Sequence, residues 1–498
     1  MPSIEVLIGL VALLLAVRYY VTRNYDYWKK RRVPGPEPVA LFGTMKDVRL
    51  SKVHIADYTK SVYDSYPDEP AVGLFAGTEP ALLIKDLDMI KDALVKSFVT
   101  FPDRGVKIHV DIEPLAQHLL FLEYERWKPM RRKLAPTFTS GKLKEMFYLV
   151  NECADHFADY LENLASKNEP IECRELTAKF TTDVIGVCVF GLNMNALADE
   201  DSEFRKIGRR IFADSWFTRL KLLSRFLPHW AVVPFKSFLQ DEHTDIFFIN
   251  TVTSTMEYRK KNNIRRHDFI DLLMDIRDHP EQVGEEEISD VILTAQAFVF
   301  FLAGFETSST TISNAMYELA LNPDIQDNLR QEVKVAFQEN NGKLSYDVIK
   351  NMKYLDKVFR ETLRKYPPVG MLQREAVSDH IFADSNISIT KGTKIFVPVY
   401  AIHYDPNIYP DPNKFDPERF EEDAVESRPH MTYLPFGDGP RICIGERFAH
   451  IQTKLGLATV IRHFKLEVCE KTCKQYEKQT GLILIAPKSG LYLRITKL

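Results

Sequence analysis

The chain has 498 residues, of which 45% are hydrophobic and 11% aromatic, enough for a large buried core. Its formal net charge of -4 offers no electrostatic basis for binding nucleic acid. Six cysteines over this length are too sparse for a disulfide framework. Cys469 and Cys473 form a C-x3-C pair, but no second ligand pair lies at zinc-site spacing, so we interpret them as ordinary thiols.

The first predicted element is an apolar helix at residues 4–21, interrupted only by Glu5 and Arg18. Its charge-free core, 6–17, is short enough to be the apolar region of a cleaved signal peptide, but an acidic residue precedes it and the basic residues follow it. The positive-inside rule therefore predicts a retained signal anchor at 1–32, with the rest of the chain in the cytosol. The aromatic residues expected at the membrane interface are Tyr19, Tyr20, Tyr25, Tyr27 and Trp28.

A proline-rich segment, VPGPEP at 33–38, follows the anchor and predicts a stiff hinge. Strand patterns are few: two strands around a turn at 71–86, a β-rich stretch at 393–402 and a terminal hairpin at 481–498. Most of the remainder has helical periodicity, including 142–165, 174–190, 241–261 and 322–339. The sequence therefore predicts a mainly α fold with small β-sheets.

One long helix is predicted at 285–321, from an acidic start to Asn322-Pro323. Its middle is apolar on all sides and contains AGFET, 303–307, where small residues allow a large group to approach. The Thr307 hydroxyl is expected to bond to a backbone carbonyl and open the helix locally. A buried Glu306 beside that hydroxyl is a candidate proton relay, and a satisfied glutamate at a kink is the alternative.

The segment FGDGPRICIG, 436–445, surrounds Cys443 with three glycines, and Arg441 lies two residues away. The glycines permit backbone angles that other residues avoid, so the loop is suited to presenting Cys443 as a thiolate. For an isolated cysteine, a small buried hydrophobic residue is the more common interpretation.

Three further patterns are ambiguous by themselves. Trp127 and Arg131, four residues apart, share a helical face and could cover a flat anion or simply pack against each other. Glu361 and Arg364 are three residues apart, as in many surface pairs, and Arg419 follows Pro417 in FDPERF.

Taken together, these motifs resemble the cytochrome P-450 family, and they occur in the family's order. They are W-x3-R at 127–131, A-G-x-[DE]-T at 303–307, E-x-x-R at 361–364, P-E-R-F at 417–420 and F-x-x-G-x-R-x-C-x-G at 436–445. The anchor and proline-rich segment resemble the microsomal branch, which implies the endoplasmic reticulum membrane. Segments 118–127, 136–147 and 295–309 resemble insect enzymes linked to detoxification.

The resemblance implies the cytochrome P-450 fold, with haem b between the long helix and the cysteine loop. Cys443 would be the axial iron ligand, and Phe436 would pack beside its sulfur. Ala303 would leave room for the cofactor. The side chains expected near the haem propionates are one tryptophan and four arginines: Trp127, Arg131, Arg374, Arg441 and, less directly, Arg104. Glu361, Arg364 and Arg419 would form a buried ionic cluster behind the loop. One cofactor gathering these residues predicts a single catalytic domain at 39–498.

The resemblance also implies a monooxygenase that inserts one oxygen atom of O2 into a lipophilic substrate, with Thr307 and Glu306 managing protons. Electrons would come from NADPH through NADPH-cytochrome P-450 reductase, with cytochrome b5 as a second candidate donor. A basic face suits such a partner: Lys128, Arg132, Lys133, Lys142 and Lys144. The alternatives are a haem-thiolate isomerase or lyase acting on peroxides, a haem-based sensor, and a biosynthetic hydroxylase of hormones, pheromones or lipids.

The segments expected to line the substrate pocket are largely apolar and aromatic, which favours a hydrophobic substrate such as a plant toxin or insecticide. They are 105–120, 209–240, 298–305, 369–372 and 480–484. Segment 211–235 mixes aromatic and basic residues, which predicts a second contact with the membrane surface.

Overall fold

The computed structural model describes residues 4–199, 201–213, 215–225, 227–266, 268–383 and 385–498. These residues divide into two compact units, each assembled from segments that are distant in sequence. The first comprises Met1–Val106, Val369–Ile408 and Pro429–Ile442; the second comprises Lys107–Pro368, Tyr409–Arg428 and Cys443–Leu498. The predicted single catalytic domain at 39–498 stays a prediction.

The first unit is built around a four-stranded sheet in the order β1-β2-β7-β4, with a separate β5-β6 hairpin. β2 pairs antiparallel with β1 and parallel with β7, and β4 is antiparallel to β7. Its strands are β1 (Ala71–Ala76), β2 (Glu79–Ile84), β4 (Leu372–Glu375), β5 (His380–Phe382), β6 (Ile387–Ile389) and β7 (Lys394–Val397). Its helices are α1 (Ile4–Thr22), α2 (Tyr27–Lys30), α3 (Lys46–Arg49), α4 (Ile55–Ser65), α5 (Leu87–Lys91), η1 (Asp92–Lys96) and α19 (Val399–His403).

The chain that follows α1 packs against this sheet. Trp28 is buried, and its indole N–H donates to the carbonyl oxygen of Leu74 at 2.8 Å. The prediction that Trp28 belongs to a membrane-interface belt is therefore wrong, because its ring fills the core beside Gly73, where a Cβ would clash with it. The proline-rich segment also lies on β1, since the Gly73 N–H donates to the Pro34 carbonyl at 2.8 Å.

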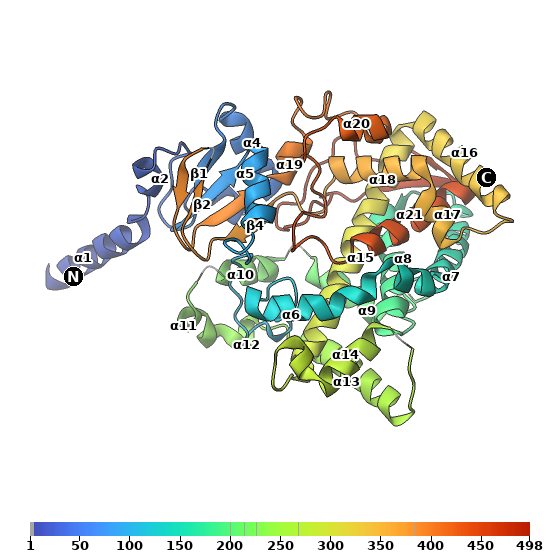
Figure 1. Ribbon diagram of the computed structural model, residues 1–498, viewed down its shortest axis with the longest axis horizontal. Coiled ribbons are helices and arrows are strands. Elements are labelled where there is room, and N and C mark those ends of the chain that lie inside the picture. Colours follow the sequence, from blue (N-terminus) through green and yellow to red (C-terminus); the bar gives the residue numbers. More distant parts are fainter. Residues whose placement is uncertain (1–3, 200, 214, 226, 267, 384) are drawn as a thin grey trace. The chain divides into compact units, whose positions relative to one another are not determined.

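The second unit is mainly helical (Figure 1). Its larger helices are α6 (Tyr124–Leu134), α7 (Ser140–Ala165), α8 (Cys173–Ile185), α9 (Glu203–Ile211), α10 (Trp216–Ser224), α13 (Glu242–Lys261), α14 (Phe269–Asp278), α15 (Asp290–Leu321), α16 (Pro323–Glu339), α18 (Lys353–Lys365) and α21 (Glu446–His463). Its shorter ones are η2 (Pro114–Ala116), η3 (Ala135–Phe138), η4 (Gly186–Phe190), α11 (His229–Val232), η5 (Val233–Phe235), α12 (Lys236–Leu239), η6 (Pro280–Val283), α17 (Tyr346–Asn351), η7 (Pro417–Phe420) and α20 (Glu422–Glu426).

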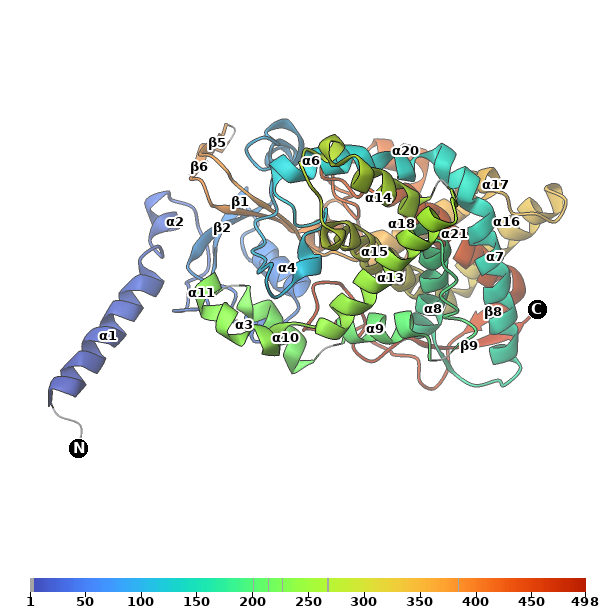
Figure 2. The ribbon, with the colours of Figure 1, turned by 90° about the horizontal axis from the view of Figure 1, so that it is seen from below.

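A three-stranded sheet in the order β3-β9-β8 completes this unit, close to the C-terminal ends of α7 and α21 (Figure 2). It consists of β3 (Ile171–Glu172), β8 (Phe464–Glu467) and β9 (Tyr492–Lys497). The predicted terminal hairpin at 481–498 is wrong, because β9 pairs with β3 and β8 rather than with 481–486. Apart from isolated bridge positions at Lys478, Leu484 and Pro487, the residues just before β9 stay irregular.

The long helix α15 runs through the second unit and packs along α8 (Figure 1). It has 32 residues, which gives a rod of about 48 Å. It begins at Asp290 rather than at 285, because Ser289 has extended dihedrals and its hydroxyl caps the Ile292 N–H. The predicted strand region 393–402 also ends early: β7 stops at Val397, and Pro398, which has no N–H for a ladder, leads into α19.

Two described helices are long and apolar enough to cross a membrane by length and composition. α15 is mostly buried within the second unit, as a core helix is. α1 is different, because only Val21 of its residues is buried. The first three residues of the predicted anchor lie outside the described part of the chain.

Candidate active site

The cysteine loop, 436–445, is shaped by two of its three glycines. Gly437 and Gly439 both have φ of +73°, a conformation that side-chain-bearing residues rarely adopt. A Cβ at position 439 would also lie 2.0 Å from the carbonyl oxygen of Leu94. Gly445 differs from the prediction: its φ of -91° is open to any residue, and the space around it is free.

Cys443 lies two residues before the cap of α21, where the partial positive charge of a helix N-terminus favours a thiolate. All six cysteines are described, and Cys443 alone is exposed. Burial raises the pKa of the Cys153 and Cys173 thiols well above the ordinary range, and that of Cys188 to about 12. These three are therefore held as neutral thiols.

Two arginines are buried together in the first unit. Arg374 on β4 and Arg441 are 2% and 3% exposed. Arg441 donates from Nε to the Pro102 carbonyl at 2.6 Å and lies 3.1 Å from the Asp103 carboxylate. Burial and the charge of Arg441 lower the pKa of Arg374 to about 10, and its Nε has no hydrogen-bond partner in the described chain. An anion bound beside these two buried guanidinium groups would stabilise their charged forms. Arg104 lies nearby, with Nη2 3.5 Å from the Arg441 carbonyl.

On α6 in the second unit, Trp127 is buried and Arg131 is half-buried one turn later. Burial lowers the pKa of Arg131, and the charge of Cys443 opposes that shift. Arg131 therefore lies within electrostatic range of the cysteine. Phe436, in the first unit, is half-buried.

The AGFET segment presents Ala303 and Thr307 on an open part of α15: Ala303 is exposed and Thr307 is half-buried. Thr307 donates from Oγ1 to the Ala303 carbonyl at 2.6 Å, which confirms the predicted bond to the backbone. The predicted local opening is wrong, because α15 stays α-helical through this turn.

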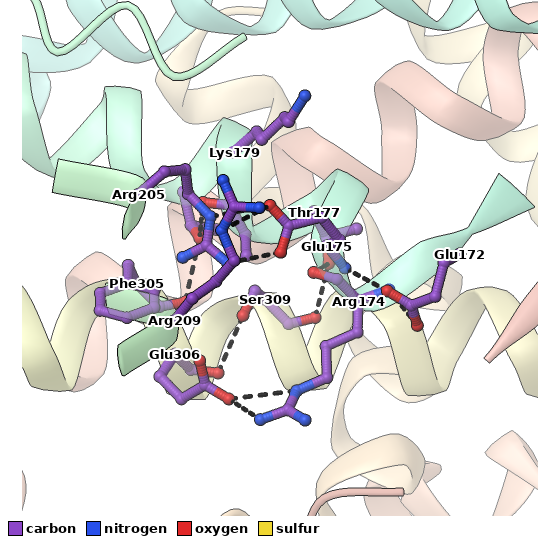
Figure 3. Close-up of polar contacts among 12 residues, drawn as sticks. Glu172, Arg174, Glu175, Thr177, Lys179, Arg205, Arg209, Phe305, Glu306 and Ser309 are labelled. Atoms are coloured by element: carbon purple, nitrogen blue, oxygen red, sulfur yellow. Dashed lines mark hydrogen bonds and ion pairs between the residues drawn. The ribbon is translucent and has the colours of Figure 1, made fainter. Parts of the chain in front are cut away.

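Glu306 has a partner that the sequence did not predict (Figure 3). Its carboxylate is buried and receives two N–H groups of Arg174 on α8, one of them from Nε at 3.2 Å. Burial lowers the pKa of the Arg174 guanidinium. The neighbouring carboxylate of Glu306 raises it by more, so the pKa lies above its ordinary value. The guanidinium is therefore charged, and the acid is held toward α8.

This ion pair borders a polar cavity of 220 Å³. Its charged lining residues are Glu172, Arg174, Glu175, Arg205, Arg209, Glu306 and Lys488. Arg205 makes two bonds to Glu175, at 3.1 and 2.7 Å, and both residues line the cavity (Figure 3).

The E-x-x-R pair is a buried ion pair on α18. Arg364 donates from Nε to Glu361 at 2.7 Å and from Nη2 at 2.8 Å, and both side chains are fully buried. Arg419, on the 3-10 helix η7, lies 3.6 Å from the same carboxylate. The three residues of this ionic cluster are thus brought together, although their side chains are up to 58 positions apart in sequence.

The basic face is partly neutralised within the chain. Lys133 bonds to Asp275 at 2.6 Å, and Lys142 pairs with Glu145. Lys144 pairs with Asp347, whereas Arg132 is exposed.

Comparison with known proteins identifies the family. The family model described as cytochrome P450 matches residues 33–494. The chain belongs to the cytochrome P450 family. It is 40% identical to cytochrome P450 6A1 of Musca domestica, over 96% of this chain and 95% of that protein. It is 37% identical to cytochrome P450 6B2 of Helicoverpa armigera, over 97% and 96%, and to cytochrome P450 6j1 of Blattella germanica, over 99% and 98%.

This P450 is therefore a haem-dependent monooxygenase that uses O2, and P450 enzymes generally work with a redox partner. Its residues fit a haem: an exposed cysteine at a helix N-terminus, a small residue exposed on α15, and a buried Arg374 whose Nε has no hydrogen-bond partner among the described residues. Sequence reasoning missed Arg174, Glu175 and Arg205, because no local pattern links α8 and α9 to position 306.

Proposed function

We propose that this P450 oxidises lipophilic foreign compounds, such as plant toxins or insecticides, by inserting one oxygen atom from O2. The observation that carries this proposal is the open part of α15 at Ala303 and Thr307, which follows the half-buried apolar residues Phe298 and Leu302 on the same helix. A site walled by such residues favours a hydrophobic substrate.

Haem, when bound, supplies the activation of O2. We propose that the Cys443 sulfur would hold the haem iron, with Phe436 beside that sulfur and Ala303 leaving space for the cofactor. The side chains proposed to meet the propionates are Trp127, Arg131, Arg374, Arg441 and Arg104. The buried pair Arg374 and Arg441 supports this assignment, since an anion would offset both their desolvation and their mutual repulsion. The ionic cluster of Glu361, Arg364 and Arg419 is assigned a structural role.

For proton handling we propose Thr307 and Glu306. The Thr307 hydroxyl donates to Ala303, which leaves its oxygen free to accept a proton donor such as water. The carboxylate of Glu306 is restrained by Arg174, so protons would reach it from the polar cavity rather than directly from Thr307. In this arrangement Arg174 is a positioning residue.

The electrons would come from NADPH through NADPH-cytochrome P-450 reductase, with cytochrome b5 as a possible second donor. The exposed Arg132, with Lys128 and Lys133 beside it on α6, is the proposed centre of the docking face.

We place the enzyme at the endoplasmic reticulum membrane with its catalytic part in the cytosol. The exposed apolar helix α1 supports an anchor. Large side chains in 211–235 are also exposed, Trp216 by 66%, Trp230 by 78% and Phe235 by 60%, which supports a second contact; positions 214 and 226 lie outside the described residues. Deleting residues 1–22, which keeps the buried Trp28 in place, should release the protein from membranes only partly, and complete release would refute the second contact.

The test of the function is reconstitution with the reductase and NADPH against a panel of plant toxins, insecticides and endogenous lipids. We expect a foreign compound to gain one oxygen atom, labelled when the gas is 18O2. Products formed from peroxides without O2 would show an isomerase or lyase instead. Turnover of endogenous lipids alone would show a biosynthetic hydroxylase.

A further inference from the structure

Two segments of the second unit are fastened together by polar contacts and a small apolar cluster. One is the loop 107–113, and the other comprises the described residues of 221–232. Arg225 donates to both carboxylate oxygens of Glu113, at 3.0 and 2.8 Å, and Lys221 lies 3.3 Å from the same group. The apolar part of the contact is a buried cluster made of Ile112, Val232 and Leu239.

A histidine pair forms a third tie between these segments. The Nδ1 atoms of His109 and His229 lie 3.3 Å apart. The ring centroids are 5.6 Å apart and the planes are tilted by only 25°, so the rings meet edge to edge through these nitrogens. Nε2 of His109 lies 3.2 Å from the Ser224 carbonyl, and Nε2 of His229 lies 3.2 Å from the Asp111 carboxylate.

These three contacts require one proton more than two neutral imidazoles carry. A carbonyl and a carboxylate only accept, so each Nε2 must bear a hydrogen. The contact between the two Nδ1 atoms needs a third hydrogen, because two bare nitrogens would face each other with their lone pairs. Two neutral rings hold two hydrogens in total, so the complete set exists only when one ring is an imidazolium.

We propose that His109, His229 and Asp111 form a proton-dependent latch that fastens loop 107–113 to the segment 221–232. With the extra proton bound, all three contacts are made. When the proton leaves, one contact becomes repulsive, and the two segments separate more readily.

Charged groups lie close to both segments of the latch. The nearest is Asp111, at 3.2 Å from His229. The other charged groups facing the contact are Glu113 on the loop, Lys221 and Arg225 on the α10 side, and Asp245 at the start of α13. Asp241 is paired with Arg210. Apart from Asp241, these groups comprise three carboxyl groups and two cations.

The direction of the pH effect follows from the number of hydrogens that the three contacts need. Contacts that need the proton stabilise the protonated pair, so the latch is complete at low pH and weakens as pH rises. If both segments border the substrate pocket, which rests on the proposed function, the latch makes access to that pocket depend on pH. The latch itself does not depend on that assumption.

The test is hydrogen–deuterium exchange of the full-length, haem-loaded protein in lipid nanodiscs, without substrate. Exchange is compared at about pH 6 and about pH 8, on either side of the titration of a free imidazole near 6.5, with times scaled to the intrinsic rate. We expect several-fold less protection of amides in 107–113 and 221–232 at the higher pH. His109→Gln and His229→Gln should each remove that difference.

His243→Gln is the matched control, because His243 is 58% exposed and lies 3.6 Å from Glu203, much as His229 lies beside Asp111. It should leave the pH dependence unchanged. Equal protection at both pH values in the unmodified protein would overturn the latch, as would a pH dependence that persists in both latch variants. Because no substrate is present, failure here is distinguishable from failure of the proposed activity.

Discussion

Replacing Arg364 with leucine should destabilise the second unit strongly. The change removes the bonds of Arg364 to Glu361 at 2.7 and 2.8 Å, and one to the Pro412 carbonyl at 2.9 Å. It leaves Glu361 fully buried, with the Asp416 N–H at 2.9 Å and Arg419 at 3.6 Å as its remaining partners. Removing one member of a buried ion pair costs about 3–5 kcal/mol.

The loss should depend on pH. Burial raises the pKa of Glu361 above its ordinary value, even though Arg364 opposes the shift. The folded protein therefore binds this proton more readily than the unfolded chain, and stability falls as pH rises above the ordinary glutamate range. Without Arg364 that pKa rises further, so the variant should lose less stability at about pH 5 than at about pH 8.

The assay is urea unfolding at both pH values, monitored by far-ultraviolet circular dichroism. The midpoints are compared between variants whose free energies of unfolding depend on urea with the same slope. Combining Arg364→Leu with Glu361→Gln should recover part of the loss, because the stranded charge is gone. Lys353→Leu is the control on the same helix: Lys353 and Glu422 are both more than 80% exposed, so the midpoint should not move. An unchanged midpoint in Arg364→Leu, or an equal loss at both pH values, would refute the reasoning.

Three further changes test other parts of the site. Gly439→Ala should abolish haem incorporation, because the Cβ would meet the Leu94 carbonyl at 2.0 Å and the residue would be strained at a φ of +73°; the haem-to-protein ratio measures it. Thr307→Ala should retain haem and substrate but form several-fold less product per NADPH and release more peroxide. Neutralising Lys128, Arg132 and Lys133 together should raise the reductase concentration for half-maximal rate several-fold at low salt, and less at high salt.

Each change has a control. Gly445→Ala should load haem normally, since its backbone is unstrained and its surroundings are open; equal failure of both glycine variants would contradict the steric argument. An unchanged ratio of product to NADPH in Thr307→Ala would remove its hydroxyl from proton handling. For the basic face, turnover driven by added peroxide should be unaffected, and loss of both activities would point to damaged structure.

Local patterns in the sequence predicted much of the fold. The helices at 142–165, 241–261 and 322–339 appear within two residues of their predicted limits, because periodicity and caps are local signals. The two strands at 71–86 are also confirmed. The terminal hairpin failed because strand pairing is decided by distant partners: β9 pairs with β3, more than three hundred residues earlier.

In the candidate site, too, local features were predictable and contacts between distant residues were not. Gly437, Gly439 and the Thr307 bond follow from local geometry and were predictable, whereas Gly445 was not needed for its conformation. The Arg174 partner of Glu306 was not, since 132 positions separate the two residues and only the packing of α8 on α15 joins them. Trp28 was misassigned because an aromatic side chain that follows an apolar helix suits a membrane interface and a protein core equally well.

The central claim is that Cys443 supplies the thiolate ligand of the haem. The most direct measurement is the carbon-monoxide spectrum of the reduced protein in Cys443→His, with Cys469→His and Cys473→His as controls at half-buried cysteines. A neutral nitrogen cannot replace the electron donation of an anionic sulfur. The spectrum of Cys443→His should therefore change from the thiolate type to the imidazole type, with loss of NADPH-supported oxygenation, while both controls keep the thiolate type. A thiolate-type spectrum that persists in Cys443→His would contradict the account.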